Sequence, residues 1–134
     1  MTQQQPKKFQ CSLEVRGYEL DSFGHVNHAT YISYLEHARW KMLAEVSIGL
    51  KEFQEWKRFP VIAEVNAKYR KPTFLGESLE VRTEVVESGR VSFTLEQRIF
   101  RAAELVFEGR VKVVLVDETG RPAAMPEGVA RLWT

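Results

Sequence analysis

The sequence of 134 residues predicts an α+β domain in which an antiparallel five-stranded sheet is wrapped around one long helix. A single segment repeats its apolar residues with the spacing of an α-helix, and five segments alternate apolar and polar residues as β-strands do. The gaps between the last four of these strands are short, which favours antiparallel neighbours. One amphipathic helix must bury its apolar stripe against one face of that sheet.

The first predicted strand comes directly before a polar loop. Phe9, Cys11, Leu13 and Val15 alternate with polar residues, as in a half-buried strand. Cys11 is the only cysteine, so the chain can form no intramolecular disulfide, and we interpret Cys11 as a small core side chain in a protein of a reducing compartment. Residues 20–27 then break the alternation with Asp, Ser, Gly and His, which are typical of turns.

The long helix is predicted after this loop. Its apolar stripe consists of Tyr31, Leu35, Ala38, Met42 and Val46. Asn27 precedes the stripe and is a suitable N-cap, and Gly49 is a suitable end. Residues 50–56 are expected to add a further helical turn.

The remaining strands follow Pro60. They are predicted over residues 61–70, 79–85, 91–99 and 105–115. Residues 1–8 and 119–134 are expected to be loop or tail, and residues 1–134 together form a single domain. One helix cannot cover both faces and both edges of such a sheet, so we expect a second subunit and a dimer at least.

Composition excludes several classes of protein. The formal net charge of +1 provides no global field that would attract nucleic acid. No apolar run approaches the roughly 20 residues of a membrane span, and residues 1–10 are too polar for a signal peptide. We therefore expect a cytoplasmic protein.

The segment from Tyr18 to Tyr31 contains the residues best suited to catalysis. It places the carboxylate of Asp21 and the imidazoles of His25 and His28 just before or at the start of the predicted helix, where backbone N–H groups lack intrahelical partners. Such donors can stabilise a developing oxyanion next to a carboxylate. Hydrolysis of a thioester needs little more than these two groups. Its leaving thiol has a pKa of about 8.5 or somewhat above and departs without an obligatory general acid.

From Val15 to Trp40 the sequence resembles the signature of the 4-hydroxybenzoyl-CoA thioesterase family. It is most similar to the bacterial long-chain acyl-CoA thioesterase branch, which shares the Asp, His-Val-Asn, Tyr and Glu-x-Ala-Arg-Trp elements. The stretches at residues 69–72, 75–77 and 90–100 also resemble this family, so the resemblance spans nearly the whole chain.

The resemblance implies a hotdog fold and a homodimer or homotetramer with active sites at the subunit interface. It implies that Asp21 is the catalytic aspartate, acting as nucleophile or as general base on water. His28 falls where the family's oxyanion-hole N–H lies, and His25 and Asn27 match the His-Val-Asn element. No cofactor is implied.

The substrate contacts are expected from three places. Tyr31 is the aromatic residue of the helix that we expect to line the acyl pocket, and the resemblance puts the segment from Arg90 to Ser92 where relatives bind coenzyme A phosphates. Lys71 forms a basic cluster with Lys68 and Arg70, and this cluster either clamps these phosphates or forms a solvated strand face. Relatives that act on small acyl groups often have a second Asp where this chain has Glu19, which favours a fatty acyl group.

Each site residue also has a simpler interpretation. Asp21 could only cap a turn, and His25 could either orient Asp21 or touch the substrate. Glu36 and Arg39, three residues apart on the helix, could form a structural pair. The spacing of the acidic and histidine residues is not a recognised zinc pattern, so we predict no metal.

Three rival functions share the predicted fold. The substrate could be an acyl group on acyl carrier protein instead of coenzyme A. The chain could be a non-catalytic acyl-CoA binding or sensing module, because a fold does not determine function. A hydratase acting on enoyl-CoA is the least favoured, since the helix itself has no matching Asp/His motif.

Overall fold

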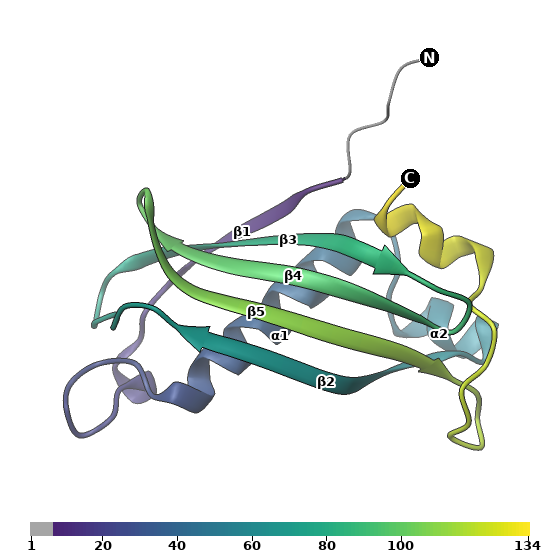
Figure 1. Cartoon of the computed structure of the whole chain (residues 1–134), viewed down its shortest axis with the longest axis horizontal. Coiled ribbons are helices and arrows are strands. Elements are labelled where there is room, and N and C mark those ends of the chain that lie inside the picture. The colour runs from purple at the N-terminus through teal and green to yellow at the C-terminus, as the bar shows by residue number, and fades with distance from the viewer. Residues whose placement is uncertain (1–6) are drawn as a thin grey trace, which may run out of the picture.

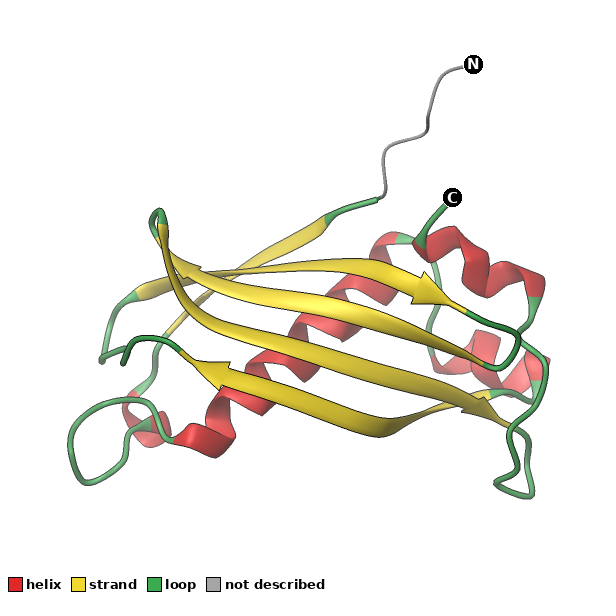
Figure 2. Ribbon diagram, viewed as in Figure 1, coloured by secondary structure: helices red, strands yellow, loops and turns green. Residues whose placement is uncertain are grey.

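The computed structural model describes residues 7–134, so part of the expected N-terminal tail lies outside the described residues. The elements are β1 (Phe9–Glu14), η1 (Gly17–Glu19), α1 (His28–Glu45), α2 (Leu50–Trp56), β2 (Phe59–Tyr69), β3 (Ser78–Ser88), β4 (Ser92–Arg101), β5 (Glu104–Val116) and η2 (Glu127–Leu132). The strands form one antiparallel sheet in the order β1-β3-β4-β5-β2. Helix α1 crosses one face of this sheet diagonally (Figures 1 and 2). The predicted α+β class and the sheet around one long helix are confirmed.

Helix α1 begins where the sequence predicts and ends earlier. The side chain of Asn27 accepts a hydrogen bond from the Ala29 N–H, which confirms the N-cap. The helix does not reach Gly49, because the chain turns at Ser47, whose φ is 60°. The Ile48 N–H then donates to the Leu43 carbonyl, a hydrogen bond that is common at the C-terminal ends of helices. Gly49 instead precedes α2 as its N-cap.

The buried stripe of α1 is fixed to the sheet by a polar contact inside the core. Gln97 of β4 is fully buried, and its amide N–H donates to the Leu35 carbonyl and to the Thr83 hydroxyl, each at 3.0 Å. Its amide oxygen accepts from the Arg39 guanidinium at 3.0 Å. Burial lowers the pKa of Arg39. The expected pair of Glu36 and Arg39 does not form within the described residues, because Arg39 turns toward Gln97 instead.

Close approach of α1 to β5 requires a glycine. A Cβ atom at Gly109 would lie 2.5 Å from Leu35 Cδ1 and 3.3 Å from the Phe107 ring. We expect Gly109→Ala to lower the free energy of unfolding by about 1–3 kcal/mol, since both neighbours are fully buried and cannot move aside. Urea unfolding measures this loss. Gly89→Ala is the matched control, because its nearest neighbour would lie at 3.7 Å, and an equal loss there would contradict the packing argument.

The C-terminal segment differs from the expected loop. Residues 127–132 form η2, and its Val129 and Leu132 are buried against the core. A Cβ atom at Gly128 would lie 2.5 Å from the Trp56 ring, so η2 also packs closely against α2. The Gly and Pro residues of this segment favoured a loop prediction, so the burial of Val129 and Leu132 in the core was not predicted.

Strand β2 is an edge strand that the rest of the chain leaves exposed. Val61, Ile62 and Val65 are 46%, 41% and 41% exposed. A bulge between Ile62 and Glu64 interrupts the expected alternation, so that Ile62 and Val65 both face the side of the helix.

Cys11 packs against the core as expected, and burial raises the pKa of its thiol.

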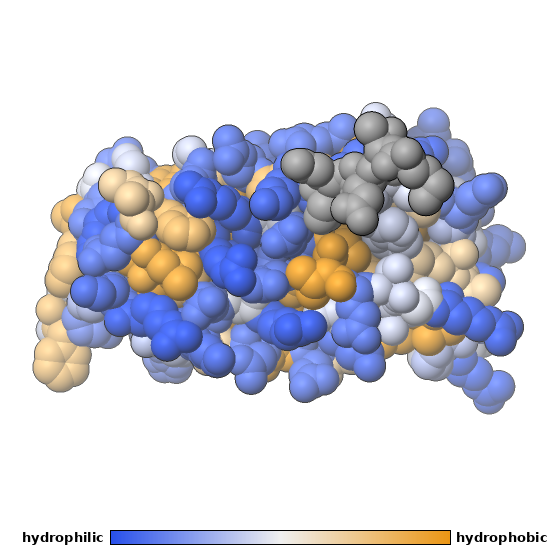
Figure 3. All heavy atoms as spheres, turned by 45° about the horizontal axis from the view of Figure 1, so that its top comes forward, coloured by the Kyte–Doolittle hydropathy of each residue, from blue (hydrophilic) through white to orange (hydrophobic). Residues whose placement is uncertain are grey.

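The outer face of the sheet is polar. Cross-strand ion pairs cover it, among them Arg70–Glu108 at 2.7 Å and Arg98–Glu108 at 3.5 Å. Figure 3 shows a mainly hydrophilic surface with small hydrophobic areas on the side that it presents. Within residues 7–134, no helix is both long and apolar enough to cross a membrane.

Candidate active site

The loop between η1 and α1 is a compact turn. The Asp21 N–H donates to the His25 carbonyl at 2.9 Å, and the Gly24 N–H donates to the Asp21 carbonyl at 3.0 Å. Gly24 has a φ of +83°, which side chains rarely adopt, so the glycine allows the chain to reverse here. A bridge between Leu20 and Val26 closes the base of the loop. The loop therefore holds Asp21 in a defined position.

The two carboxylate oxygens of Asp21 have different partners. Oδ1 accepts the Phe23 N–H at 2.9 Å, and Oδ2 lies 3.2 Å from His25 Nδ1. The side chain of Asp21 is 24% exposed, so solvent or a ligand can still reach it. The turn interpretation and the chemical one are thus compatible, because one oxygen caps the turn and the other faces an imidazole.

His25 is held by aromatic neighbours. Its ring stacks on Phe23 with centroids 5.8 Å apart and meets the edge of Phe74 at 6.4 Å. Its backbone also forms a bridge with Phe74. These contacts fix the imidazole beside Asp21, an arrangement suited to orienting a carboxylate.

The start of α1 leaves one amide available. The Ala29 N–H is used by the Asn27 side chain, and the Thr30 N–H donates to the Asn27 carbonyl. The His28 N–H has no hydrogen-bond acceptor among residues 7–134. This amide is the free donor that the sequence predicts at the helix N-terminus, whereas the Asn27 side chain is engaged as the cap.

Asp21 and His28 line the same cleft, which has a volume of about 260 Å³. The other lining residues are His25, Val26, Tyr31, Tyr69, Arg70, Lys71 and Pro72. Tyr31 lies at the base, where its hydroxyl pairs with Thr73 Oγ1 at 2.7 Å and burial raises its pKa. The structure therefore brings together Asp21, His25, His28, Tyr31 and Lys71.

Tyr69 is a cleft residue that the sequence argument treated as an ordinary strand position. Its hydroxyl donates to the His28 carbonyl at 2.7 Å, and its ring meets Tyr31 with centroids 5.5 Å apart. Tyr69 thus connects β2 to the first turn of α1. Its place at the end of the strand, directly before the Arg-Lys-Pro stretch, was the available signal.

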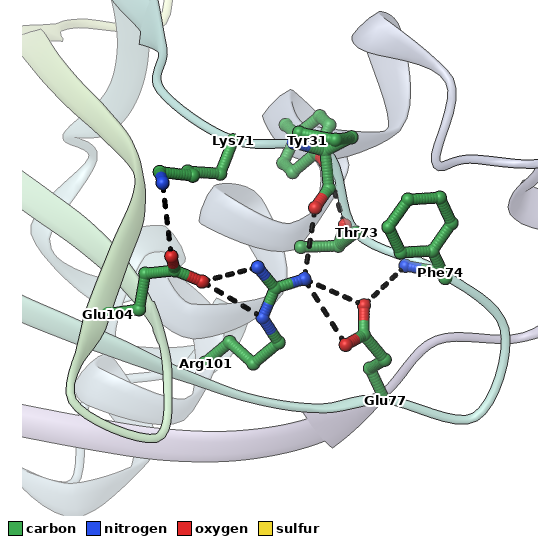
Figure 4. A network of polar contacts seen from close by, with 8 residues as sticks. Tyr31, Lys71, Thr73, Phe74, Glu77, Arg101 and Glu104 are labelled. Atoms are coloured by element: carbon green, nitrogen blue, oxygen red, sulfur yellow. Dashed lines mark hydrogen bonds and ion pairs between the residues drawn. The ribbon is translucent and has the colours of Figure 1, made fainter.

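The segment from Lys71 to Glu77 supports the loop from behind. The Val26 N–H donates to the Thr73 carbonyl at 2.9 Å. Arg101 of β4 donates to the Pro72 carbonyl at 3.0 Å and to both carboxylate oxygens of Glu77, and it also pairs with Glu104 (Figure 4). The hydrogen bond to Glu104 is the main cause of the raised pKa of Arg101. One guanidinium thus organises the support of the cleft.

Glu19 joins the loop to the helix. It is only 7% exposed, and its carboxylate accepts hydrogen bonds from the Arg16 backbone N–H, from the Arg16 guanidinium and from the Tyr34 hydroxyl at 2.8 Å. Its carbonyl accepts the Asn27 N–H at 2.9 Å. Burial favours a higher pKa for Glu19, but the hydrogen bonds from Arg16 outweigh it and lower the pKa.

We expect Glu19→Gln to lower the free energy of unfolding by about 1–3 kcal/mol at pH 7, because charge-assisted hydrogen bonds are lost at a buried site. The pKa of Glu19 is lower in the folded state, so its contribution is present above the pKa of the unfolded chain and is lost as the pH falls through the folded pKa. Urea unfolding of both proteins from pH 7 to pH 3 should therefore show a narrowing difference below about pH 4.5. A difference that stays constant with pH would exclude this ionic role.

The basic cluster is mostly neutralised within the chain. Lys71 Nζ lies 3.3 Å from a carboxylate oxygen of Glu104, and Arg70 pairs with Glu108. Hydrogen bonds from Arg101 and Lys71 lower the pKa of Glu104, so the ion pair with Lys71 persists at neutral pH. These residues are less available for phosphates than the sequence alone suggested.

Arg90 and Ser92 lie far from the cleft in the same chain. Ser92 pairs with Val114 at one end of the sheet, whereas Ile99 pairs with Phe107, the partner of Tyr69, at the other. Seven residues of strand separate these positions, which corresponds to about 23 Å. The structure therefore does not bring Arg90 and Ser92 to Asp21 within one protomer.

Comparison with known proteins decides the family. The family model described as the thioesterase-like superfamily matches residues 15–132. The chain belongs to this superfamily. It is 32% identical over 124 residues to the long-chain acyl-CoA thioesterase FadM of Escherichia coli K12, and the match covers 91% of this chain and 93% of FadM.

Two further proteins extend the comparison. The chain is 31% identical over 122 residues to the chloroplastic acyl-acyl carrier protein thioesterase ATL2 of Arabidopsis thaliana. That match covers 90% of this chain, which spans 65% of the length of ATL2. The crystal structure of E. coli YbaW, described as a probable thioesterase, superposes with a TM-score of 0.84 at 28% identity, covering 94% of this chain and 99% of YbaW. The expected hotdog fold is confirmed.

The residues of this superfamily member form no evident metal site. Among residues 7–134, no group of three His, Cys, Asp or Glu side chains is placed to hold a metal ion. The groups that line the cleft include the carboxylate of Asp21 and the imidazole of His25.

Proposed function

We propose that the chain hydrolyses acyl-CoA thioesters to free acid and coenzyme A. The observation that carries the proposal is the shared cleft at the start of α1, which Asp21 and His28 both line and where the His28 N–H has no acceptor among the described residues. Membership of the thioesterase-like superfamily supports the same reaction class.

In this proposal the two groups act on opposite sides of one carbonyl. The His28 N–H donates to the thioester oxygen and stabilises the negative charge that develops there. Asp21 Oδ2 either attacks the carbonyl carbon, giving an acyl-aspartyl anhydride that water then hydrolyses, or removes a proton from an attacking water. Either route breaks the carbon–sulfur bond and releases the coenzyme A thiol. His25, 3.2 Å away, positions Asp21 for this step.

We also propose a homodimer that pairs β2 with its copy. Unpaired strand edges with exposed apolar side chains favour such pairing, and the exposure of Val61, Ile62 and Val65 supports it. Antiparallel pairing about a two-fold axis places the Tyr69 end of one strand beside the Phe59 end of the other.

This two-fold symmetry would bring Arg90 and Ser92 of one protomer toward the cleft of the other. Both residues lie at the same end of the sheet as Phe59, since Phe59 pairs with Val116 and Ser92 with Val114. In the dimer this end of the partner would lie beside the Asp21 cleft, with Arg90, in the turn between β3 and β4, two to three strand spacings, or roughly 10–14 Å, from the edge. Coenzyme A is long enough to span that distance. The active site would then combine two protomers.

The acyl group is proposed to be a fatty chain. The similarity to FadM, which is a long-chain acyl-CoA thioesterase, supports this choice. The aromatic and aliphatic lining of the cleft around Tyr31 and Tyr69 is also compatible with an apolar chain.

Acyl carrier protein is the second candidate carrier. Neutralisation of Arg70 and Lys71 by Glu108 and Glu104 leaves little basic charge at the cleft of one chain for coenzyme A phosphates. The similarity to ATL2, an acyl-acyl carrier protein thioesterase, points the same way. Comparison of acyl-CoA, acyl-pantetheine and acyl carrier protein substrates of equal chain length separates the two, because only the first carries the nucleotide.

The test of the proposed function is thiol release from acyl-CoAs of several lengths. We expect catalytic thiol release that increases with chain length, together with stoichiometric free acid. Tight binding of acyl-CoA without any release, and equal inactivity toward acyl carrier protein substrates, would indicate a binding module instead.

A further inference from the structure

The free N–H of His28 belongs to one of two peptide groups that meet at the Cα atom of this residue. In the first group, between Asn27 and His28, the Asn27 carbonyl accepts the Thr30 N–H at 3.0 Å, whereas the His28 N–H has no acceptor within the described part of the chain. Peptide groups are rigid planes joined at Cα, so the direction of this N–H also depends on how the next group is held.

The second peptide group, between His28 and Ala29, is held at both ends. Its N–H donates to the Asn27 side chain at 2.9 Å, and its carbonyl accepts the Tyr69 hydroxyl at 2.7 Å. A carbonyl oxygen has two lone pairs and a helix uses one of them, so the hydroxyl binds without breaking the helix. Tyr69 thus anchors the first turn of α1 to the last residue of β2.

The ring of Tyr69 is itself fixed by aromatic contacts. It meets the ring of Phe107 with centroids 5.1 Å apart and the ring of Tyr31 with centroids 5.5 Å apart, both edge to face. Phe107 and Tyr31 are buried and stack on each other. The hydroxyl of a tyrosine lies at the end of a rigid ring, so the contacts that fix the ring also fix the hydroxyl.

A purely structural tie is the simpler interpretation of the hydrogen bond between Tyr69 and His28. The helix is already fixed to the sheet, however, by the buried amide of Gln97, which donates to the Leu35 carbonyl. Tyr69 is 50% exposed and lines the same cleft as Asp21 and His28. Its hydroxyl binds the residue that provides the free donor, and this position favours a role in the reaction.

We propose that Tyr69 is a positioning residue, whose hydroxyl holds the His28–Ala29 peptide group so that the His28 N–H points to the thioester oxygen. The inference rests on the proposed function. The hydroxyl stays bonded to the His28 carbonyl and takes no part in bond making or breaking. Because negative charge on the thioester oxygen develops in the transition state, a misplaced donor weakens the transition state more than the bound substrate. Tyr69 therefore acts on kcat and leaves substrate binding unchanged.

Tyr69→Phe tests this role, because it removes the hydroxyl and keeps the ring contacts. We expect kcat for acyl-CoA hydrolysis to fall about tenfold, less than the roughly 10²-fold cost of a gross misplacement, since Asn27 still holds the first turn. KM should change by less than about twofold. Tyr18→Phe is the matched control, because Tyr18 is 81% exposed and does not line the cleft, and it should keep the wild-type kcat.

Two ligands that are not hydrolysed separate positioning from a general effect on the pocket. A difluoroketone analogue of acyl-CoA forms a hydrate with the tetrahedral geometry of the intermediate, whereas a thioether analogue has no carbonyl oxygen. Calorimetric titration of Tyr69→Phe should show about tenfold weaker binding of the ketone and less than about twofold weaker binding of the thioether.

Equal weakening of both ligands, or a kcat of Tyr69→Phe within about twofold of the wild type, would overturn the positioning role. Absence of thiol release by the wild type would instead overturn the proposed hydrolysis. Hydrogen exchange of the Ala29 amide still tests the anchor in that case, because this amide shares its peptide group with the His28 carbonyl. Its exchange should be at least about threefold faster in Tyr69→Phe, and an equal rate in the two proteins would show that the hydroxyl does not order the first turn.

Discussion

Asp21→Asn is expected to lower kcat for acyl-CoA hydrolysis by at least about 10²-fold, the usual contribution of a positioned acid–base or nucleophilic group. Asn has the same shape as Asp, and its carbonyl oxygen can still accept the Phe23 N–H that fixes the turn. It is neither a nucleophile nor a base at neutral pH. The loop should therefore remain folded while the reaction is lost, and a thiol-release assay at saturating substrate measures the effect.

Asp117 provides a matched control for this substitution. Its Oδ1 accepts the Thr119 N–H at 2.8 Å, and its carbonyl accepts the Gly120 N–H, as in the turn around Asp21. Asp117 does not line the cleft. We expect Asp117→Asn to keep the wild-type kcat, and equal thiol release by wild type and Asp21→Asn would remove Asp21 from the mechanism.

The second large effect is expected from mixed dimers. Arg90→Glu alone should lower kcat/KM for acyl-CoA by about 10–10²-fold, because a charge-assisted contact with phosphate is replaced by repulsion. A heterodimer of one Asp21→Asn chain and one Arg90→Glu chain should recover about half of the wild-type kcat/KM per dimer. One of its two sites then combines an intact Asp21 from one chain with an intact Arg90 from the other.

The heterodimer is obtained by co-expression of the two chains with different affinity tags. The parent homodimers, which have no intact combination, define the background. A heterodimer no more active than the mean of its parents would show that Arg90 serves the site of its own chain or none. The roughly 23 Å between the ends of the sheet argues for the shared arrangement.

The regular elements could be predicted because their signals are local. Alternation located β3 to β5, helical spacing located α1, and the Asn27 cap marked its first residue. The order of these elements, together with the need to bury the apolar stripe of α1, was sufficient to predict the architecture. The loop that carries Asp21 was found for a similar reason, since its turn residues are consecutive.

Features that depend on tertiary contacts could not be predicted in this way. The buried position of Glu19 depends on Arg16 and on Tyr34, which the helix brings back across the loop. The ion pair that occupies Lys71 comes from Glu104, far along the chain. The distance of Arg90 from Asp21 follows from the register of three strands, and local periodicity does not contain that register.

Arg101 illustrates how the position of the cleft residues depends on a side chain that does not itself line the cleft. Its guanidinium holds the Pro72 carbonyl, Glu77 and, through Glu104, Lys71, and so supports the segment behind His25 and Val26. A random mutagenesis screen scored only by turnover would recover this position among its strongest hits. Genetic data of that kind would suggest a catalytic arginine, whereas the structure places Arg101 outside the cleft and in contact with the segment that supports it.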